Sequence, residues 1–520
     1  MSSKFAFNGL FLLVVVTALI FRAAWLDLRP MHHDEANQAV KFGSLLEKGE
    51  YRYDPTEHHG PTLYYLTLPF AWIKAGTSFA AVDERTLRLV TVVFGVGMIL
   101  LLLLLRGGCS LPAVFFSGIF AAVSPLLVFY NRFYIQETLL VFFLVGTVAS
   151  GWKYWQQRTW GWAAAAGFFC GMMYATKETS LIVFAALVAA LALTFVFRVK
   201  PGPDELRLRK IAPVHVLIFL GMGFAVSFLF YSSFFKNPQG FLDSVLAFKI
   251  YFSRAGEAGF HAHPWPYYLK MLAFSRYGTG PTWSEALILV LASAGAAAVF
   301  MPAAAKESSP KFARFVFFFT LSAVVVYSSI PYKTPWNMLP FYVGMILLAG
   351  NGAAFLFRLS RKMVYQSLIF LMLGLGLFHL GSMCYRANFV YYADSRNPYV
   401  YAQTSPDFLN LVDRVRDLSR LHPDGKKMLI KVITHPDEAW PLPWYLRDFD
   451  HVGYWQEMEE AGDLSRAPLI ISSVDKIERL ELHFESDYLS EFYGLRPEVL
   501  LAVHIRKDLW ERFLGEKARK

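Results

Sequence analysis

Long uninterrupted blocks of apolar residues limit what this chain can fold into more than any other feature. Eleven blocks, most of them long enough for a helix to cross a bilayer, fill much of residues 1–385. They lie near residues 6–26, 87–105, 111–130, 138–152, 160–176, 179–197, 212–234, 284–302, 313–331, 337–357 and 364–385. Charged residues make up only 17% of the chain, against about 25% in soluble domains. The sequence therefore predicts an integral membrane protein and excludes a cytosolic enzyme.

Lysine and arginine in the short connections set the predicted orientation. With the N-terminus in the cytoplasm, the inner connections carry fifteen basic residues against three acidic ones, as the positive-inside rule requires. The basic residues are Lys4, Arg106, Lys153, Arg158, Arg198, Lys200, Arg207, Arg209, Lys210, Lys306, Lys311, Arg314, Arg358, Arg361 and Lys362. The net charge of +10 is thus mostly a topology signal in an inner (plasma) membrane protein, and no nucleic-acid partner is predicted.

Eleven spans place the C-terminus on the outer side of the membrane, in the periplasm or outside the cell. The first block lacks a small-residue cleavage site before Trp25, which favours a retained anchor over a signal peptide. Large loops at 27–86 and 235–283 then face outward, and the short apolar segment 61–76 is predicted to be an interfacial helix within the first of them.

The last 135 residues differ in character from the rest. Residues 386–520 are rich in charge and contain two β-like runs, MLIKVIT (428–434) and PLIISS (468–473). A short helix is expected between them, after the prolines of WPLPWYLRDF. The chain is therefore predicted to have a transmembrane domain over 1–385 and a small extracytoplasmic α/β domain over 386–520.

Polar motifs gather at the outer ends of the predicted spans, whereas the bilayer interior is nearly free of charge. They are MHHDEANQ (31–38), EHHGP (57–61), NRFYIQE (131–137), TKET (176–179), HAHPWP (261–266) and YKTPWN (332–337). Ionisable residues at membrane depth are costly, so this distribution indicates a functional site at the outer membrane–water boundary. Such a site is open to a lipid headgroup and to a soluble partner.

The carboxylates in these motifs have two interpretations. Asp34 at the edge of an apolar pocket suits a general base, but it could equally cap the helix that follows. Glu137 opens a span, where the helix dipole stabilises it and Arg132 could pair with it. Lys177 and Glu178 share a short turn in which a structural ion pair is the simpler explanation.

The remaining motifs are open to similar alternatives. Lys333 suits a phosphate group, but Tyr332 and Trp336 beside it are also typical of an interfacial anchor. A divalent metal ion is a further alternative, with His32, His33, His261 and His263 as its candidate ligands. Satisfied interfacial histidines are the simpler interpretation, because no metal-binding spacing such as HExxH occurs.

Taken in order, these motifs resemble the GT-C membrane glycosyltransferases, among them the protein O-mannosyltransferases and the lipid A aminoarabinose transferase. The resemblance rests on HHDEANQ, RFYIQE, TKETS and KTPWNMLP, and it covers about the first 350 residues. The segments YRYDPTEHHGPTLYYL, YKTPWN and WPLPWYLRDFDHVGYW are similar to a bacterial and archaeal branch labelled "flippase activity-associated".

The resemblance implies a sugar donor on a polyprenyl phosphate and a lipid, glycan or protein acceptor at the outer face. Asp34 would be the general base, Glu35 would support it, and Glu137 would be the second acidic position. The donor phosphate would be held by Arg132, Lys177, Tyr332 and Lys333. The substrates would also contact His58, His59, His261, His263, Trp336 and Arg447. A base opposite a phosphate leaving group implies inversion at the anomeric carbon.

Two rival functions are also considered for this sequence. A polyprenyl-linked glycan flippase would show internal repeats and charges near the midplane, and the chain has no such repeat. A flippase-associated lipid-binding protein would have kept the fold without the chemistry. In the tail, Trp440, Trp444 and Tyr445 could recognise an acceptor, but core packing is favoured for the two tryptophans because large aromatic side chains are usually buried.

Overall fold

The computed structural model describes residues 2–197, 211–255, 261–301, 308–359, 362–484 and 487–518. The chain divides into two compact units. The membrane unit comprises Met1–Leu26, Glu50–Phe70 and Arg85–Val390, and the sheet unit comprises Asp27–Gly49, Ala71–Glu84 and Tyr391–Lys520. Two segments that were expected in the first outer loop of the transmembrane domain, 27–49 and 71–84, are thus part of the sheet unit.

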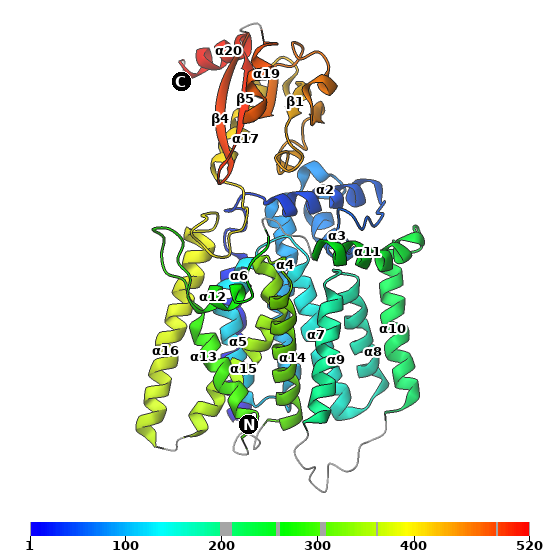
Figure 1. Cartoon of the computed structure of the whole chain (residues 1–520), viewed down its shortest axis with the longest axis vertical. Coiled ribbons are helices and arrows are strands. Elements are labelled where there is room, and N and C mark those ends of the chain that lie inside the picture. The colour runs from blue at the N-terminus through cyan, green and yellow to red at the C-terminus, as the bar shows by residue number, and fades with distance from the viewer. Residues whose placement is uncertain are drawn as a thin grey trace. The chain divides into compact units, whose positions relative to one another are not determined.

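The membrane unit is built of helices, and most of the long ones run side by side (Figure 1). They are α1 (Ser2–Ala23), α3 (Thr62–Ala75, up to the unit boundary), α4 (Glu84–Leu101), α5 (Leu111–Val123), α6 (Pro125–Asn131), α7 (Glu137–Gln157), α8 (Trp160–Tyr174), α9 (Ser180–Val196), α10 (Pro213–Tyr231), α11 (Gln239–Ala255), α12 (Tyr267–Ala273), α13 (Ala286–Ala298), α14 (Pro310–Ser329), α15 (Leu339–Leu359) and α16 (Met363–Tyr385). Each of the eleven predicted apolar blocks coincides with a helix or, at 111–130, with the pair α5 and α6.

Six helices in the described residues are long and apolar enough to cross a membrane. A seventh span results if the bent pair α5 and α6 is counted as one, and α9 and α13 are shorter apolar helices. The prediction of a mainly helical membrane protein with a small α/β part is confirmed. Seven of the basic residues that set the predicted orientation lie outside the described residues, namely Arg198, Lys200, Arg207, Arg209, Lys210, Lys306 and Arg361.

A buried carboxylate holds the 62° bend between α5 and α6. Ser124 caps α6, Pro125 occupies its first turn, and Glu285 accepts hydrogen bonds from the Leu126 amide (3.0 Å) and from the Ser124 hydroxyl (2.8 Å). Glu285 has no exposed surface, so these bonds replace the water that the freed helix end would otherwise need. The bend directs the short α6 toward the loop that leads to Glu137.

Close helix contacts in the membrane unit depend on small residues. A methyl group added at Gly295 of α13 would lie 2.0 Å from the carbonyl oxygen of Leu348 in α15. The two helices can therefore pack backbone to backbone only because residue 295 lacks a side chain. Small residues have this role in membrane helix packing generally, because van der Waals contact rather than water exclusion drives association there.

The sheet unit is an α/β fold around one five-stranded sheet with the order β2-β1-β3-β5-β4. Strands β1, β2 and β3 are mutually parallel, whereas β5 is antiparallel to β3 and β4. The elements are α2 (His33–Lys48), α17 (Asp407–Leu421), β1 (Ile430–Ile433), α18 (Leu442–Tyr445), β2 (Val452–Trp455), β3 (Leu469–Ser473), α19 (Ile477–Glu481), β4 (Tyr488–Arg496), β5 (Val499–Arg506) and α20 (Lys507–Lys517). Both predicted β-runs are thus strands, and the helix expected after the prolines is α18.

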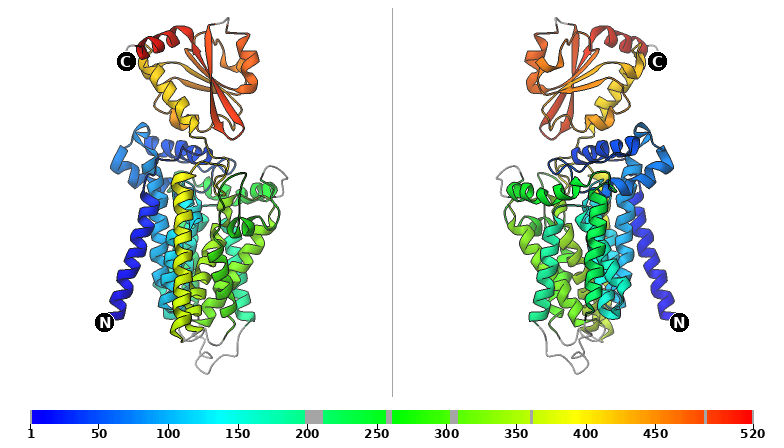
Figure 2. Two further views of the ribbon diagram at one scale, coloured as in Figure 1. Left: turned by 90° about the vertical axis from the view of Figure 1, so that its left-hand side faces the viewer. Right: turned by 90° about the vertical axis from the view of Figure 1, so that its right-hand side faces the viewer.

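Both faces of the sheet are covered (Figure 2). Helices α17 and α20 pack on one face. The other face has a cluster of buried side chains, made of Ile433, Ala461, Leu464, Ala467, Ile470, Leu480 and Phe484. Strands β1 and β3 are buried along their whole length and most of their residues are apolar, which is why the sequence revealed them.

Candidate functional site

In the membrane unit, a buried ion pair lies at the start of α7. Lys177, in the turn between α8 and α9, donates a hydrogen bond to Oε1 of Glu137. Glu137 is 2% exposed and Lys177 is 5% exposed. The second carboxylate oxygen of Glu137, Oε2, is buried and has no hydrogen-bond partner among the described residues. Buried polar atoms are nearly always paired, so an oxygen of this kind indicates a place for a donor from a bound molecule.

A second buried carboxylate follows directly in the same turn. Nδ1 of His59 lies 2.8 Å from Oε2 of Glu178, and the Tyr53 hydroxyl donates to Oε1 over 2.7 Å. Burial alone would raise the pKa of Glu178, but the charge and hydrogen bond of His59, together with the Tyr53 bond, outweigh burial and lower the pKa. The carboxylate is therefore held in its charged form beside the imidazole.

The segment that contains EHHGP (57–61) packs closely against the segment that contains TKET (176–179). The Thr62 amide donates to the Ala175 carbonyl oxygen (3.3 Å), and the Thr62 hydroxyl donates to that of Thr176 (2.8 Å). A methyl group added at Gly60 would lie 2.3 Å from the Ala175 carbonyl oxygen. Gly60 thus permits the close approach that places His59 on Glu178. Both motifs stand out in the sequence, but nothing in their spacing predicts that they meet.

Arg132, which the resemblance assigned to the donor phosphate, is engaged with backbone. Its guanidinium donates four hydrogen bonds to carbonyl oxygens at the C-terminal end of α1, those of Phe21, Arg22, Ala24 and Trp25, over 2.6–3.1 Å. The last carbonyls of a helix lack partners within the helix, and a buried arginine can supply them. The structure therefore gives Arg132 the role of a helix cap.

Lys333 joins two loops of the membrane unit. Its ammonium group donates to the carbonyl oxygens of His263 (2.8 Å) and Ile330 (2.5 Å), and burial lowers its pKa. The neighbouring rings pair across the same loops, with His261 against Tyr332 (4.6 Å between centroids). His263 is stacked on the ring of Tyr267, four residues later in the same segment (4.1 Å between centroids). Trp336 is buried against Tyr130 and Phe133.

In the sheet unit, Asp34 occupies the first turn of α2 with its side chain 41% exposed. The helix is capped by other groups: His32 Nδ1 accepts from the Asp34 amide (3.0 Å), and Glu35 accepts from the His32 amide (3.1 Å). The alternative in which Asp34 caps the helix is therefore not what the structure shows, because Glu35 and His32 form the capping box. The Asp34 carboxylate is left facing outward, 3.8 Å from the His32 ring.

The segment before Asp34 is tied to residues near the other end of the chain. Met31 receives a hydrogen bond from the Thr404 hydroxyl (2.7 Å) and donates its amide to the Tyr445 hydroxyl (2.9 Å). His32 Nε2 lies 3.0 Å from the Tyr401 carbonyl oxygen, and the Gln403 amide donates to the Pro30 carbonyl oxygen (2.9 Å). Asp34 is thus held by the sheet unit itself.

The aromatic block of the tail is mainly structural. Trp444 is fully buried and donates its indole N–H to Glu84 (2.8 Å). Arg447 stacks on the Trp444 ring and donates to the carbonyl oxygens of Phe79, Val82 and Trp444. The preference for packing therefore holds for Trp444. Trp440 is only half-buried and faces the ring of His33 at 5.8 Å.

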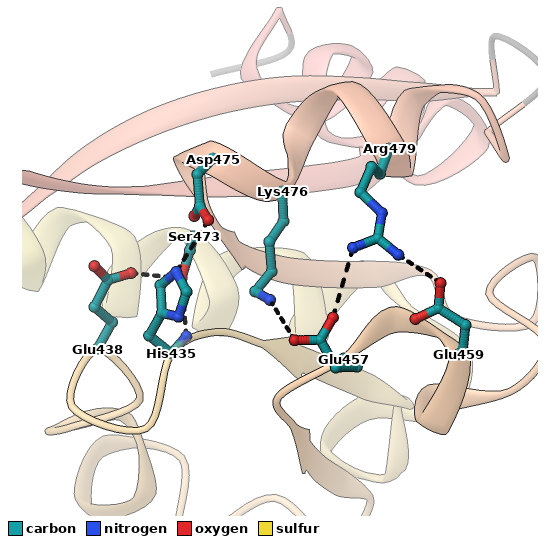
Figure 3. A network of polar contacts seen from close by, with 8 residues as sticks. All are labelled: His435, Glu438, Glu457, Glu459, Ser473, Asp475, Lys476 and Arg479. Carbon is teal, nitrogen blue, oxygen red and sulfur yellow. Dashed lines mark hydrogen bonds and ion pairs between the residues drawn. The ribbon is translucent and has the colours of Figure 1, made fainter.

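A third polar cluster lies at the carboxyl ends of the parallel strands (Figure 3). His435, after β1, pairs with Asp475, after β3 (3.0 Å), while Lys476 and Arg479 pair with Glu457 and Glu459. None of these residues was predicted to belong to a site, although their positions after the strand ends were the signal. Most of these side chains are about half exposed or more.

Metal ligation is not supported by the described residues, which contain no group of three or more histidine, cysteine, aspartate or glutamate side chains placed to hold an ion. His32 and His33 belong to the sheet unit, whereas His261 and His263 belong to the membrane unit. We therefore propose no metal site.

Comparison with known proteins identifies the fold. Residues 67–201 match the sequence model of the family described as dolichyl-phosphate-mannose-protein mannosyltransferase. No curated protein matches the chain. The structure is similar to ArnT from Cupriavidus metallidurans bound to undecaprenyl phosphate, with a TM-score of 0.59 and 14% identity over 95% of this chain and 98% of that chain. It is also similar to the archaeal oligosaccharyltransferase AglB from Archaeoglobus fulgidus in complex with an inhibitory peptide and a dolichol-phosphate, with a TM-score of 0.58 and 11% identity over 95% and 74%.

The matched family and both structures are glycosyltransferases, which is the enzyme class that the sequence predicted. The resemblance inferred from the motifs is confirmed: the chain has the fold of the GT-C membrane glycosyltransferases.

Proposed function

We propose that this chain is a glycosyltransferase of the inner (plasma) membrane, with its N-terminus in the cytoplasm. It moves a sugar from a polyprenyl-phosphate donor to an acceptor hydroxyl at the outer face. The observation that carries the proposal is the buried Glu137–Lys177 pair with its unpartnered carboxylate oxygen. Burying such a pair costs several kcal/mol per ion, so an incompletely satisfied pair is better explained by substrate than by stability. The similar structures that hold undecaprenyl phosphate and dolichol-phosphate support the class of donor.

Asp34 is the proposed general base. Its carboxylate is exposed at the start of α2, and the capping box of His32 and Glu35 fixes the turn that presents it. In the proposed step the acceptor hydroxyl gives its proton to Asp34, and its oxygen bonds to the anomeric carbon. The bond from that carbon to the phosphate oxygen breaks at the same time. A single displacement of this kind inverts the anomeric configuration.

The phosphate is assigned to lysines rather than to Arg132. An ammonium group has three N–H donors. Lys333 uses two of them on backbone carbonyls and Lys177 uses one on Glu137, so each retains a donor for a phosphate oxygen. The four bonds of Arg132 to α1 leave it a structural role. Glu137, through Oε2, is proposed to accept a hydrogen bond from the acceptor.

The test uses the full chain in phospholipid vesicles with undecaprenyl phosphate carrying a radiolabelled hexose or pentose. Release of free undecaprenyl phosphate is followed for the wild type, for Asp34→Asn and for Asp424→Asn, an exposed aspartate of the sheet unit. Loss of a general base lowers turnover by on the order of 10²- to 10⁴-fold. We expect that loss in Asp34→Asn, with lipid binding kept, and wild-type turnover in Asp424→Asn.

Two outcomes would overturn the proposal. If the wild type binds the donor lipid but releases nothing with any sugar or acceptor extract, the chain is a lipid-binding or flippase-associated protein. If Asp34→Asn turns over as fast as Asp424→Asn, the assignment of the base is wrong.

A further inference from the structure

One of the two tryptophans in the aromatic block of the tail is not explained by packing. Trp444 is fully buried and contacts Glu84 and Arg447. Trp440, in contrast, is only half-buried, and its indole N–H has no hydrogen-bond partner among the described residues. Its ring faces that of His33, with 5.8 Å between the centroids. A partly exposed indole with an unused donor is typical of a surface that binds a ligand, because tryptophan is enriched among the residues that dominate binding energy.

The loop that carries Trp440 is fixed in place at its start. This loop, residues 434–441, follows β1, and the amide of His435 donates to the hydroxyl of Ser473 in β3 (3.1 Å). The same hydroxyl donates to the carboxylate of Glu438, so that β3 supports the loop at two points (Figure 3). A surface that is already ordered loses little conformational freedom when a ligand binds, which favours affinity.

The same loop contacts the residue beside Asp34. Arg496 of β4 donates to the carbonyl oxygen (3.2 Å) and to the carboxylate (2.6 Å) of Asp437. The backbone of Asp437 is also hydrogen-bonded to the ring of His33. Asp34 follows His33 directly, and its carboxylate has only the His32 ring, at 3.8 Å, as a polar neighbour among the described residues. Within the sheet unit, His33 therefore lies between the loop and the Asp34 carboxylate.

The position of the loop in the sheet is one at which α/β domains bind ligands. The chain passes from β1 to β2 on one side of the sheet order, whereas β3 lies on the other side of β1 and leads on toward β4. The connections after β1 and β3 therefore diverge at the carboxyl ends of two adjacent parallel strands. Ligands of open α/β sheets bind beyond the strand ends at such a point.

The charges around the loop suit a neutral ligand. Asp34 and Glu438 have no lysine or arginine partner among the described residues, whereas Arg496 balances Asp437. Burial lowers the pKa of His33 by more than the charge of Asp34 raises it, so the imidazole is neutral at pH 7. A neutral imidazole can donate to and accept from hydroxyl groups, and carboxylates accept from them. The unbalanced carboxylates would repel an anionic ligand.

We propose that Trp440, His33 and Asp437 form the binding surface for the acceptor, and that this acceptor is a neutral sugar residue of a glycan. The inference rests on the proposed function and names its acceptor class. A sugar offers C–H groups on one face to the indole ring and hydroxyl groups to His33 and to the carboxylate of Asp437, which is 65% exposed. The hydroxyl bound beside His33 is then presented to Asp34, the proposed base.

The experiment measures binding of soluble sugars to the full chain in phosphatidylcholine nanodiscs by saturation-transfer NMR. The probes are the methyl glycosides of glucose, mannose, galactose, N-acetylglucosamine and arabinose. Glucose 6-phosphate is the charged comparison, and a neutral serine-rich peptide is the peptide comparison. The variants are Trp440→Ala and Trp440→Phe. Trp510→Ala is the matched control, because Trp510 is a half-buried tryptophan of the sheet unit that is stacked on Phe513. Thermal unfolding of each variant verifies that it is folded.

At least one methyl glycoside should bind the wild type, with the strongest saturation on the C–H protons of one sugar face. Trp440→Ala should weaken this binding about tenfold or more, which is the usual effect of removing an aromatic anchor. Trp440→Phe keeps an aromatic face and should lose less, and Trp510→Ala should bind as the wild type does. Glucose 6-phosphate should bind more weakly than methyl glucoside, because carboxylates surround the loop.

The outcomes separate the inference from the function on which it rests. If no methyl glycoside binds, or if folded Trp440→Ala binds as tightly as the wild type, the inference is overturned even where sugar transfer is observed. Peptide binding that depends on Trp440, without sugar binding, would assign the loop to a protein acceptor instead. Tighter binding of glucose 6-phosphate would contradict the argument from charge. If sugars bind through Trp440 but undecaprenyl phosphate is never released from its sugar, the binding surface stands and the transferase function is overturned.

Discussion

The two units use ionisable residues in opposite ways. In the membrane unit the pair Glu137–Lys177 and the carboxylate of Glu178 lie almost entirely below the surface, within an apolar helix bundle. At the strand ends of the sheet unit, pairs such as His435–Asp475 are half exposed to solvent. Exposed pairs are worth at most about 1 kcal/mol, whereas a buried pair that loses one partner costs several. The comparison indicates that a functional site is better recognised by the burial of its charged residues than by their number.

The largest expected effect comes from separating the buried pair. Lys177→Met leaves the Glu137 carboxylate buried and unpaired, which should lower the free energy of unfolding by about 3–5 kcal/mol. The double variant Lys177→Met/Glu137→Gln removes both charges and should recover much of that stability while remaining inactive. Thermal unfolding in detergent gives the comparison. If Lys177→Met were as stable as the wild type, the buried pair would contribute no more to stability than the exposed pairs of the sheet unit.

Gly60→Ala tests whether the two motifs must dock. The added methyl group would lie 2.3 Å from the Ala175 carbonyl oxygen, and overpacking of this kind costs up to about 3 kcal/mol. Gly151→Ala is the matched control, because a methyl group there meets nothing within 4 Å. In Gly60→Ala, but not in Gly151→Ala, we expect a lower free energy of unfolding and a lower affinity for undecaprenyl phosphate. Equal behaviour of the two variants would show that the docking is not needed.

A buried histidine makes the sheet unit sensitive to acid. The ring of His504 in β5 forms hydrogen bonds with the hydroxyls of Ser472 (2.9 Å) and Ser490 (2.8 Å). Burial lowers the pKa of this imidazole to about 4. In the unfolded chain this histidine takes up a proton near pH 6.5, whereas His504 of the folded sheet stays neutral until the pH approaches 4. The stabilisation that is present above pH 6.5 is therefore lost as the pH falls toward 4. At pH 5 the loss amounts to about 2 kcal/mol.

Hydrogen exchange of the β3 and β5 amides, corrected for its intrinsic pH dependence, measures this loss in the full chain. His504→Gln keeps side-chain hydrogen bonding without titrating in this range, so its protection should be flat between pH 5 and 7. Wild-type protection that is equally flat would mean that His504 is not buried in its neutral form.

The smallest effect is expected at the strand ends. Asp475→Asn removes the charge opposite His435, where the side chains are 61% and 48% exposed. Pairs of this kind change stability by less than about 1 kcal/mol, and high salt should reduce the change further. Hydrogen exchange of the same amides checks this. A loss comparable to that of Lys177→Met would contradict the rule drawn from the two units.

Much of the fold could be predicted because hydrophobicity acts locally. The apolar blocks correspond to helices, and the runs 428–434 and 468–473 correspond to β1 and β3. The strands β2, β4 and β5 were missed. Strands β2 and β4 are only partly buried and lack a continuous apolar run, whereas β5 (VLLAVHIR) is mostly apolar and buried, so its signal was present in the sequence. The membership of α2 in the sheet unit was also missed, since its partners lie hundreds of residues away in the chain.

The candidate site was predictable by residue type but not by role. Arg132 and Glu137 are five positions apart and suggest a pair, yet Arg132 binds the end of α1 and Glu137 binds Lys177. Likewise, His32 and Glu35 rather than Asp34 cap α2. These outcomes depend on which buried carbonyl or charge lacks a partner, and that is decided by tertiary packing rather than by spacing in the sequence.

The bonds that hold residues 30–32 have a consequence for biosynthesis. Their partners, from Tyr401 to Tyr445, follow 369 to 414 positions later. At a ribosomal rate of about 5–20 residues per second, that interval lasts on the order of 20–80 s. The helices α2 to α16 are synthesised during this interval, while the anchor for Asp34 is still missing. A polypeptide that ends before residue 401 would therefore insert into the membrane without these bonds, and we expect it to be inactive. The proposed base would be anchored only after the residues up to Tyr445 have been synthesised.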